Sequence, residues 1–431
     1  MKNRKEQYKV LTSLLCYLRE NNLYWKEKLK AYNEITEDNI EQIYYTLSII
    51  TKKNILESMY MYIDSKFTEC FTDELALKEY LLDTSDLSNN NDKCITKKGN
   101  RWDIKMTTGT TGTPFPVVLN QKEEFIASKY LIQKRREHYR QANLSNGFLL
   151  AHEVDKNIRK MNYRAANSDM HEVIDYFIEM NPKWIFVSVN SLKRFVSAIL
   201  KYRFDEVKQI DIKFIEITGA KLYKEDEELV RKVFKCPIVN QYGCREAWYI
   251  AYQCPCGNLH VNTDNLLIDI IDKNGRIITQ ENKIGEVIVT NLYAKTMPFI
   301  KYYLGDYASI SSKKCSCGNE SPILFLNGGR ASEQLKNTKC NGSEVFRQVL
   351  RVLYFKKNVR YNKIYIIQDD EFHISVYIDL LSERQEFEQK FLEVSKAIID
   401  GFDLFLVTFL YDQSFEKKDT FLKEPIFICK I

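Results

Sequence analysis

Threonine and glycine are concentrated in one short segment, TTGTTGTP at residues 107–114. Glycine lets backbone amides approach phosphate oxygens without a Cβ clash, and the threonine hydroxyls add further donors. No Lys-Ser or Lys-Thr pair follows the second glycine, so the segment is not a Walker A loop. The pattern predicts a phosphate-binding loop. An ordinary Gly/Thr hairpin turn is the alternative that a single motif leaves open.

A second chemical pattern is the repeated motif CxCGN, which contributes Cys254 and Cys256 in one copy and Cys315 and Cys317 in the other. Tetrahedral Zn²⁺ is held by four thiolates, or by three thiolates and a histidine, and His260 could replace one sulfur. A full set of protein ligands leaves no open position for water, so we expect a structural zinc. The spacing is tighter than in a standard zinc finger, and four unliganded thiols are the alternative.

Composition narrows the classes of protein that these motifs could serve. With 431 residues, 45% hydrophobic and 28% charged, the chain is expected to fold into two globular domains. A net charge of +5 over this length is too small to indicate nucleic acid binding. Eleven cysteines are too few for a disulfide scaffold, and their odd number argues against complete pairing.

The N-terminal segment starts basic but lacks a sustained apolar region and a small-residue cleavage site, so it does not resemble a signal peptide. No run approaches the roughly 18 apolar residues of a membrane span. We therefore expect a cytoplasmic protein with reduced thiols.

The elements that must position the motifs are predicted from periodicity. Residues 8–30 have helical spacing and another helix is expected before Asp83, whereas the Ser- and Asn-rich segment 86–99 is expected to be an exposed connection. Apolar runs then alternate with helical patterns, which indicates α/β layers and a largely parallel sheet. The expected strands are 184–189, 214–218 and 237–240, with a helix over 223–234.

Beyond residue 259 the sequence predicts mainly antiparallel strands, at 266–272, 285–291 and 307–311, and a change of sheet near residue 260. The C-terminal part predicts a compact α+β module with a turn at Asp369 and Asp370. Its expected elements are strands 363–368 and 372–378, a helix over 383–399 and a strand over 404–411.

The phosphate loop resembles the signature Thr-Ser-Gly-Thr-Thr-Gly-x-Pro of the adenylate-forming (ANL) superfamily, which contains acyl-CoA synthetases, peptide-synthetase adenylation domains and luciferases. Only Thr108 departs, in place of serine. Further segments are similar to family motifs in the family's order: ITGAKL at 217–222, QYGCRE at 241–246, IKYYLGD at 300–306 and GRASEQLK at 329–336. The segment NNLYWKEKL at 21–29 and the paired cysteines most resemble the phenylacetate:CoA ligase branch and its capsular-polysaccharide relatives. The resemblance covers essentially the whole chain.

This resemblance implies a set of nucleotide-binding residues. The phosphates are expected on the loop residues Thr107, Thr108, Gly109, Thr110, Thr111, Gly112 and Thr113. Gly219 and Ala220 are expected beside adenine, and Tyr242 is expected to stack on it, with Gly243 at the same strand end. Asp306 is expected to accept hydrogen bonds from both ribose hydroxyls, which one carboxylate can do.

Charged groups are implied to carry the catalysis. Glu246 is expected to help bind Mg²⁺ against the triphosphate, and Arg330 to contact ribose or phosphate. Glu333 stands at the position of the family's usual acidic hinge residue, an aspartate. A hinge needs no special chemistry, so glutamate is tolerable there. Lys423 aligns with the family's mobile catalytic lysine, which offsets negative charge on the α-phosphate. Glu246 and Thr108 are the other expected catalytic residues.

Near the catalytic lysine the match is imperfect: Leu422 replaces the usual glycine, and Lys417 and Lys418 compete for the role. Two other positions depart from the family. Arg245 stands where many members have threonine, and Lys301 where the branch usually has arginine, which loses the planar fork but keeps the charge.

The implied architecture is a large N-terminal adenylation domain, residues 1–329, with mixed parallel sheets, helices and a zinc-stapled β region at about 250–320, followed by a small mobile C-terminal α+β domain, residues 330–431. The implied activity is an ATP-dependent, AMP-forming ligase that makes an acyl adenylate and passes the acyl group to a thiol. The thiol is coenzyme A or a carrier-protein phosphopantetheine, and an aryl or arylacetic acid is the favoured substrate.

Other functions remain open at this point. One is an adenylyl or acyl transferase whose acceptor is an amine, a hydroxyl or a sugar. Another is a zinc-stabilised module that binds nucleic acid or protein, which predicts a clustered basic face and has no need of TTGTTGTP or YLGD; the charge balance disfavours it. The sequence leaves a homodimer open and identifies no nucleic acid partner.

Overall fold

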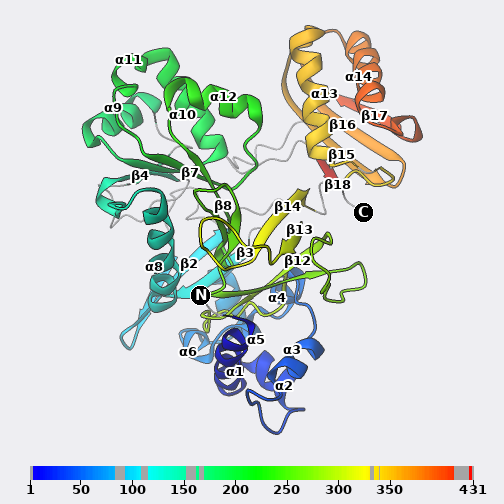
Figure 1. Cartoon of the computed structure of the whole chain (residues 1–431). Coiled ribbons are helices and arrows are strands. Elements are labelled where there is room, and N and C mark those ends of the chain that lie inside the picture. Colours follow the sequence, from blue (N-terminus) through cyan, green and yellow to red (C-terminus); the bar gives the residue numbers. More distant parts are fainter. Residues whose placement is uncertain are drawn as a thin grey trace.

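The computed structural model describes residues 3–82, 93–107, 115–151, 162–164, 169–330, 334–338, 340–411 and 427–429 (Figure 1). Its architecture is the predicted α/β one: a large mixed sheet with helices, and a smaller α+β unit at the C-terminal end. None of the helices in the described ranges combines the length and apolar character needed to cross a bilayer.

Short helices build the N-terminal part of the protein, below the large sheet in Figure 1. They are α1 (Arg4–Asn21), α2 (Leu23–Leu29), α3 (Ile40–Thr46), α4 (Lys52–Glu57), α5 (Met59–Tyr62), α6 (Ser65–Thr68) and α7 (Glu74–Leu82). The single helix expected over 8–30 is wrong, because Asn22 is extended and divides it. The Asn22 side chain accepts a hydrogen bond from the Trp25 amide and donates one to the Tyr62 carbonyl, so it caps α2 and fastens it to α5.

A small antiparallel sheet carries the predicted phosphate loop. Its strands are β1 (Lys93–Lys97), β2 (Asn100–Thr107) and β3 (Phe115–Asn120), in the order β1-β2-β3. The exposed connection expected over 86–99 is therefore wrong for its second half, which forms β1 and a turn with positive φ at Lys98 and Gly99. Thr107 pairs with Phe115, so the loop at 108–114, which lies outside the described residues, is closed at its base by a hairpin.

Eleven of the described strands form one continuous sheet, in the order β11-β12-β13-β14-β10-β9-β8-β7-β6-β4-β5. The parallel part consists of β4 (Gly147–Ala151), β5 (Asn162–Arg164), β6 (Trp184–Ser188), β7 (Phe214–Thr218) and β8 (Ile238–Cys244). The antiparallel part consists of β9 (Trp248–Gln253), β10 (Leu259–Val261), β11 (Leu266–Ile271), β12 (Gly285–Asn291), β13 (Tyr302–Ser311) and β14 (Ile323–Arg330). Each strand expected from an apolar run here is confirmed, and β8 and β13 are longer than predicted.

The change of sheet expected near residue 260 is wrong. The chain changes direction earlier, between β8 and β9, which pair antiparallel. His260 on β10 then pairs with Ile323 on β14, so hydrogen bonding continues across the position where a break was predicted. The result is a single surface on which parallel and antiparallel strands meet beside the QYGCRE motif.

Helices cover the parallel strands. They are α8 (Gln121–His138), α9 (Met170–Met180), α10 (Val189–Tyr202), α11 (Phe204–Val207) and α12 (Lys224–Val233), with a 3₁₀ turn at Leu144–Asn146. Helices α9 to α12 enclose a separate hydrophobic core with these strands, whereas Leu131 of α8 belongs to a smaller cluster with Trp184 and Phe214. The helix expected over 223–234 is confirmed as α12.

The C-terminal unit has its own sheet, in the order β17-β16-β15-β18, and its own core. Its elements are α13 (Gly342–Lys356), β15 (Tyr361–Asp370), β16 (His373–Leu380), α14 (Arg384–Ile398), a 3₁₀ turn at Phe402–Leu404, β17 (Leu406–Tyr411) and β18 (Phe427–Cys429). The expected strands and the helix α14 are confirmed, but the turn lies at residues 371–372 rather than at 369–370. Helix α13 was not among the expected elements, although Phe346, Val349, Leu350 and Leu353 have the spacing of a helix face and are buried.

A buried ion pair joins α8 to the centre of the large sheet. Arg135 Nε donates to Glu216 Oε2 at 2.6 Å and Arg135 Nη2 donates to Oε1 at 3.0 Å. The Tyr252 hydroxyl donates to the same carboxylate at 2.9 Å, and the guanidinium lies 4.5 Å from the centre of the Trp184 ring. Both charges are thus paired within the core, which is the condition for burying them without a large penalty.

We predict that Glu216→Gln lowers the free energy of unfolding by about 3–5 kcal/mol, because it leaves the Arg135 charge buried without its counter-ion. Urea denaturation followed by tryptophan fluorescence measures this change. The matched control is Asp175→Asn, which removes the exposed pair with Arg203 and should change stability by less than about 1 kcal/mol. Equal effects of the two substitutions would contradict the prediction.

Candidate functional site

The predicted adenine-binding segments meet at the carboxyl edge of the parallel strands. Gly219 directly follows β7 and has a φ of +89°, which glycine adopts readily. Because β7 and β8 are parallel and Thr218 pairs with Gln241, the chain that leaves β7 lies beside Tyr242 and Gly243. The structure therefore brings Gly219, Ala220, Tyr242 and Gly243 to one edge of the sheet, where α/β proteins usually bind ligands.

A phenol–carboxylate hydrogen bond connects this edge to the antiparallel part of the sheet. The Tyr242 hydroxyl donates to Asp306 Oδ2 on β13 at 2.5 Å. Asp306 in turn pairs with Arg330 at the end of β14, so the backbone of the predicted ribose- or phosphate-contacting arginine is adjacent. The expected adenine and ribose residues, from motifs far apart in the sequence, are neighbours in space.

Glu246 lies in the turn between β8 and β9 and is only 9% exposed. Its Oε1 accepts a hydrogen bond from the Tyr302 hydroxyl at 3.0 Å, and its backbone carbonyl accepts one from Asn291 Nδ2 at 3.0 Å. Desolvation, followed by the charge and hydrogen bond of Glu246, raises the pKa of the nearby Cys244 thiol well above its usual value. Cys244 is therefore held as a neutral thiol, in agreement with a lining role rather than a nucleophilic one.

The turn that holds Glu246 is tight. A Cβ on Gly243 would lie 1.9 Å from the Trp248 carbonyl oxygen, and Trp248 itself has a φ of +58°. Lys105 Nζ lies 5.0 Å from the centre of the Trp248 ring and 2.5 Å from Glu124 Oε1. Since Lys105 is on β2, these contacts bring the hairpin that carries the phosphate loop next to the Glu246 turn.

Lys301 does not point into this site. Its Nζ donates to the Leu47 carbonyl at 2.6 Å and lies 5.4 Å from the centre of the Tyr44 ring, and the residue is 4% exposed. Burial lowers the pKa of this amine. The lysine that replaces the branch's arginine therefore anchors β13 to the N-terminal helices, because its ammonium donates to backbone carbonyls at the end of α3.

The CxCGN motifs meet on one side of the antiparallel strands. Cys254, His260, Cys315 and Cys317 offer ligand atoms that all lie within 4.8 Å of one another. Cys254 Sγ and Cys315 Sγ are 3.8 Å apart, and Cys317 Sγ is 3.5 Å from His260 Nε2. The structure leaves the predicted ligand Cys256 out of this group; Cys256 is exposed and accepts a contact from the Ser316 hydroxyl.

Surrounding polar groups prepare the cluster for a cation. His260 Nδ1 lies 2.8 Å from the Ser321 carbonyl, so that nitrogen carries the proton and Nε2 is left with its lone pair facing Cys317. Hydrogen bonds from the Cys317 amide and Asn258 Nδ2 lower the pKa of the Cys315 thiol to about 6, which favours a thiolate, whereas desolvation raises the pKa of the Cys254 thiol to about 12. The side chains therefore could hold one tetrahedral metal ion.

Several predicted site residues lie outside the described part of the chain: Thr108, Gly109, Thr110, Thr111, Gly112, Thr113, Glu333 and Lys423. For Thr107 and Arg330 the structure describes the backbone alone. These assignments stay predictions. Three residues that contact the site were not predicted: Tyr302, Lys105 and Trp248. Tyr302 lies within the IKYYLGD motif, which was the available signal, whereas no spacing or composition signal distinguishes Lys105 and Trp248.

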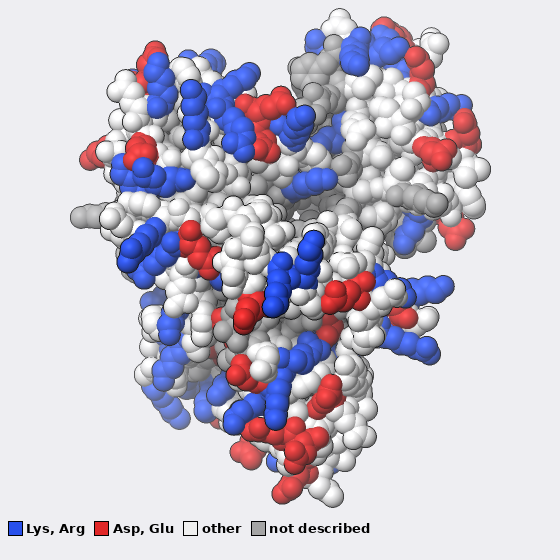
Figure 2. Space-filling model, in the orientation of Figure 1, with Lys and Arg blue, Asp and Glu red and all other residues white. Residues whose placement is uncertain are grey.

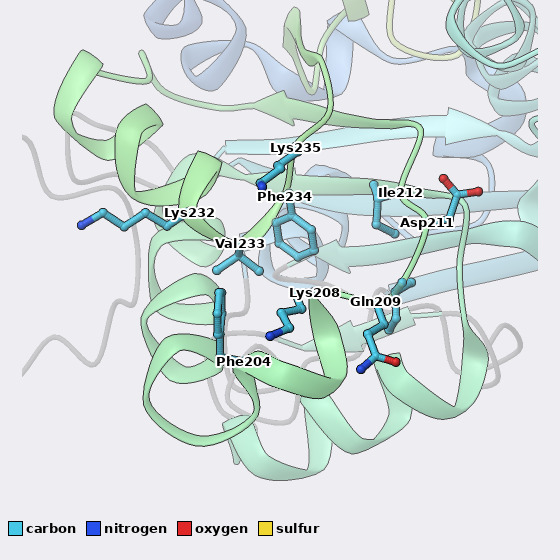
Figure 3. Close-up of a pocket in the computed structure, with 10 residues that line it drawn as sticks. Phe204, Lys208, Gln209, Asp211, Ile212, Lys232, Val233, Phe234 and Lys235 are labelled. Atoms are coloured by element: carbon cyan, nitrogen blue, oxygen red, sulfur yellow. The ribbon is translucent and has the colours of Figure 1, made fainter.

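An open surface pocket lies elsewhere. Figure 3 shows its lining, with Phe204, Val233 and Phe234 on the inner surface and Lys208 and Lys235 around it. The volume of the pocket is about 520 Å³. It is formed by residues that precede β7 and β8, so it lies at the amino ends of these strands, opposite the motif residues. We do not assign it to the nucleotide, because none of the predicted site residues lines it. On the face shown in Figure 2, basic and acidic side chains are interspersed over the lobe of α9–α12 and the C-terminal lobe.

Comparisons with known proteins agree with the motifs. Protein CapK of Staphylococcus aureus is 24% identical over 261 residues, 56% of this chain and 54% of CapK. A phenylacetate-coenzyme A ligase of Thermus thermophilus is 29% identical over 80 residues, 18% of this chain and 17% of that protein. The chain thus matches about half, or less, of the length of these curated relatives. No protein-family model matches it.

The fold has a solved counterpart in 2-hydroxyisobutyryl-CoA ligase, crystallised in the postadenylation state with 2-HIB-AMP. The TM-score is 0.67 with 10% sequence identity, and the match covers 99% of this chain and 89% of the ligase. At this identity the likeness concerns the fold. Together, the sequence relatives and the shared fold confirm the resemblance to adenylate-forming enzymes that the ordered motifs indicate.

We predict that Gly243→Ala destabilises the protein by about 1–3 kcal/mol, because the new Cβ would collide with backbone that cannot move aside without disturbing β8 and β9. Thermal unfolding measures the change. Gly99→Ala is the matched control. Gly99 also lies in a turn between two strands, but a Cβ there would meet open space, so only the φ of +77° is strained for alanine. This strain costs roughly 1 kcal/mol. A smaller fall in Tm for Gly243→Ala than for Gly99→Ala would contradict the steric argument.

Proposed function

We propose that this chain is an ATP-dependent, AMP-forming carboxylic acid ligase that makes an acyl adenylate and transfers the acyl group to a thiol. The observation that carries the proposal is the convergence of three separate motifs, ITGAKL, QYGCRE and YLGD, at one sheet edge beside the hairpin that bears TTGTTGTP. A shared fold with an acyl-CoA ligase supports it.

The first half-reaction is attack of the substrate carboxylate on the α-phosphorus of ATP. A carboxylate oxygen forms a bond to this phosphorus while the bond to the bridging oxygen breaks, and pyrophosphate leaves with that oxygen's electron pair. In the proposed arrangement Tyr242 stacks on adenine, Asp306 accepts from the ribose hydroxyls, and the amides and hydroxyls of the loop at 107–113 bind phosphate oxygens. Catalysis then comes from positioning and from charge placement.

Magnesium would accompany ATP as the metal of the substrate complex. Glu246 fits this role chemically, because it offers a carboxylate, the hard oxygen donor that Mg²⁺ prefers. Its backbone and one side-chain oxygen are already fixed by Asn291 and Tyr302, so the carboxylate has a set direction. The bound cation would screen the charge of the phosphates at the attacked phosphorus.

The C-terminal unit is proposed to be the mobile domain, starting at residue 330, with Glu333 in the hinge. It has a separate core and contacts the N-terminal lobe through Arg347, whose guanidinium lies 4.7 Å from the centre of the Tyr223 ring. Lys423 would offset the charge that develops on the α-phosphate, with Lys417 and Lys418 as competitors, and Arg330 would contact ribose or phosphate. Rotation of this unit would separate the two half-reactions.

The second half-reaction transfers the acyl group from the mixed anhydride to a thiol. The thiolate sulfur attacks the acyl carbon and AMP leaves with the electrons of the broken C–O bond. Coenzyme A or a carrier-protein phosphopantetheine is the proposed acceptor, in line with the names of the phenylacetate-coenzyme A ligase relative and the CoA ligase of similar fold. An aryl or arylacetic acid is the proposed substrate, in line with the name of the phenylacetate-coenzyme A ligase relative alone. Transfer to an amine, hydroxyl or sugar is the alternative.

We further propose that Cys254, His260, Cys315 and Cys317 hold a structural zinc ion. Two thiolates bound to one tetrahedral zinc at about 2.3 Å lie about 3.8 Å apart, and a thiolate and an imidazole nitrogen lie slightly closer. The observed separations of 3.8 Å and 3.5 Å have these values. Such a zinc would tie the β9–β10 connection to the β13–β14 connection.

Pyrophosphate exchange tests the proposed activity. With a panel of carboxylic acids that includes benzoic and phenylacetic acids, the protein should incorporate labelled pyrophosphate into ATP only when an accepted acid is present. Glu246→Ala should abolish the exchange while the far-ultraviolet circular dichroism stays unchanged, because the site would lose its metal-binding carboxylate. Exchange retained by Glu246→Ala would remove the metal assignment, and no exchange with any acid would argue against the activity.

Zinc content tests the proposed staple, independently of activity. The protein purified without chelator should contain about one zinc ion per chain, the content of a single four-ligand site. Cys254→Ser should lose the metal and lower Tm, whereas Cys256→Ser, at the cysteine outside the cluster, should retain it. Elemental analysis and thermal unfolding measure both effects. Equal metal loss from the two variants would show that the ligand set is wrong.

A further inference from the structure

We infer that Tyr302 is a positioning residue for the proposed magnesium-binding carboxylate, and that two crossed tyrosine–carboxylate hydrogen bonds couple the metal end of the site to the ribose end. This inference rests on the proposed function. Tyr302 is not one of the residues that the motifs assign to ATP, and its role follows from the tertiary contacts between β13 and the β8–β9 turn.

The two bonds have a reciprocal arrangement. The segment at β8 supplies a tyrosine, Tyr242, and four residues later a carboxylate, Glu246. Strand β13 likewise supplies Tyr302 and four residues later Asp306. Tyr242 donates to Asp306 at 2.5 Å and Tyr302 donates to Glu246 at 3.0 Å, so each segment orients the carboxylate of the other.

The environment of Tyr302 is suited to holding a carboxylate in one direction. Its side chain is 3% exposed and its ring packs 5.0 Å from the ring of Phe299, so the hydroxyl cannot swing away to water. Backbone bonds hold the strand on both sides, since Tyr302 pairs with Val289 on β12 and bridges to Ile50. The phenol donor bonded to Oε1, together with the nearby Cys244 thiol, therefore orients the Glu246 carboxylate.

This arrangement has an energetic consequence for metal binding. Partners that orient a ligating carboxylate typically raise metal affinity about 10- to 100-fold, because they remove the cost of ordering the ligand when the metal arrives. Without the Tyr302 hydroxyl, the backbone of Glu246 would keep its place in the turn through Asn291, but its side chain would lose the bond that fixes Oε1. The loss should therefore appear in magnesium affinity and be recovered at high magnesium.

The test is the magnesium dependence of pyrophosphate exchange by Tyr302→Phe, which removes the hydroxyl and keeps the ring. We expect the half-saturating free magnesium concentration to rise about tenfold or more, with the exchange rate approaching that of the unaltered protein at high magnesium. Calorimetric titration of ATP with and without magnesium provides a readout other than activity: the magnesium-dependent gain in ATP affinity should shrink in the variant.

Two further variants define the specificity of the effect. Tyr17→Phe makes the same chemical change at a tyrosine bonded to Asp64 in the N-terminal helices, and should leave the magnesium midpoint unchanged. Tyr242→Phe should raise the KM for ATP at saturating magnesium, because it frees the ribose-binding carboxylate. If Tyr302→Phe does not fold, Tyr302→His serves instead: a ring that can still donate should keep the midpoint within about threefold of the original.

The outcomes separate the inference from the function beneath it. An unaltered magnesium midpoint in folded Tyr302→Phe, with exchange still lost in Glu246→Ala, would overturn the positioning role and leave the ligase proposal standing. Absence of both ATP binding and exchange in the unaltered protein would overturn the ligase proposal itself. A defect in Tyr302→Phe that high magnesium does not relieve would show a general structural role and would likewise overturn the inference.

Discussion

The close approach of Gly243 to the Trp248 carbonyl is the constraint on which the candidate site depends. With a Cβ 1.9 Å from that oxygen excluded, only glycine lets β8 return as β9 in so short a turn. This reversal sets two features at once. It changes the sheet from parallel to antiparallel, and it places Glu246 in a turn. The Asn291 side chain stabilises this turn by donating a hydrogen bond to the backbone carbonyl of Glu246. The carboxyl edge of the parallel strands and the antiparallel strand β13 therefore face each other across a few ångströms.

Buried polar contacts, rather than apolar packing alone, bring the chemical groups together. Strand β13 is fixed to the N-terminal helices by Lys301, whose ammonium is bonded to the Leu47 carbonyl, and to the β8 segment by tyrosine–carboxylate bonds. The hairpin that carries the threonine–glycine loop reaches the same place through the contact of Lys105 with Trp248. The carboxylates of Glu246 and Asp306 are thereby held by hydrogen bonds to strands of the sheet. Such groups need to reorganise little when a charged nucleotide binds.

The Cys/His cluster likewise joins separate segments through polar side chains, at another end of the antiparallel strands. It gathers residues from the β9–β10 connection and the β13–β14 connection, and His260 itself lies on β10 beside β14. A metal there would restrict the relative movement of β9, which follows the turn of Glu246, and β13, which carries Asp306. The proposed metal site and the proposed nucleotide site would then be built on the same antiparallel strands. This would account for paired cysteines among the nucleotide motifs.

The sequence by itself determined the α/β class, the order of the nucleotide motifs, most strands of the large sheet and the cysteine pairs, because each depends on local periodicity or on a short run of residues. The helix face of α13 is also present in the sequence, although that helix was not predicted. The break at Asn22 was not predicted either, because it depends partly on the hydrogen bond from Asn22 to the distant Tyr62 carbonyl. Tertiary structure alone decided that the sheet is continuous, that His260 rather than Cys256 joins the cluster, and that Lys301 faces the N-terminal helices. The crossed bonds of Tyr242 and Tyr302 join residues 64 and 56 positions apart. Such pairings depend on strand order and register, which the alternation of residues within a single strand does not specify.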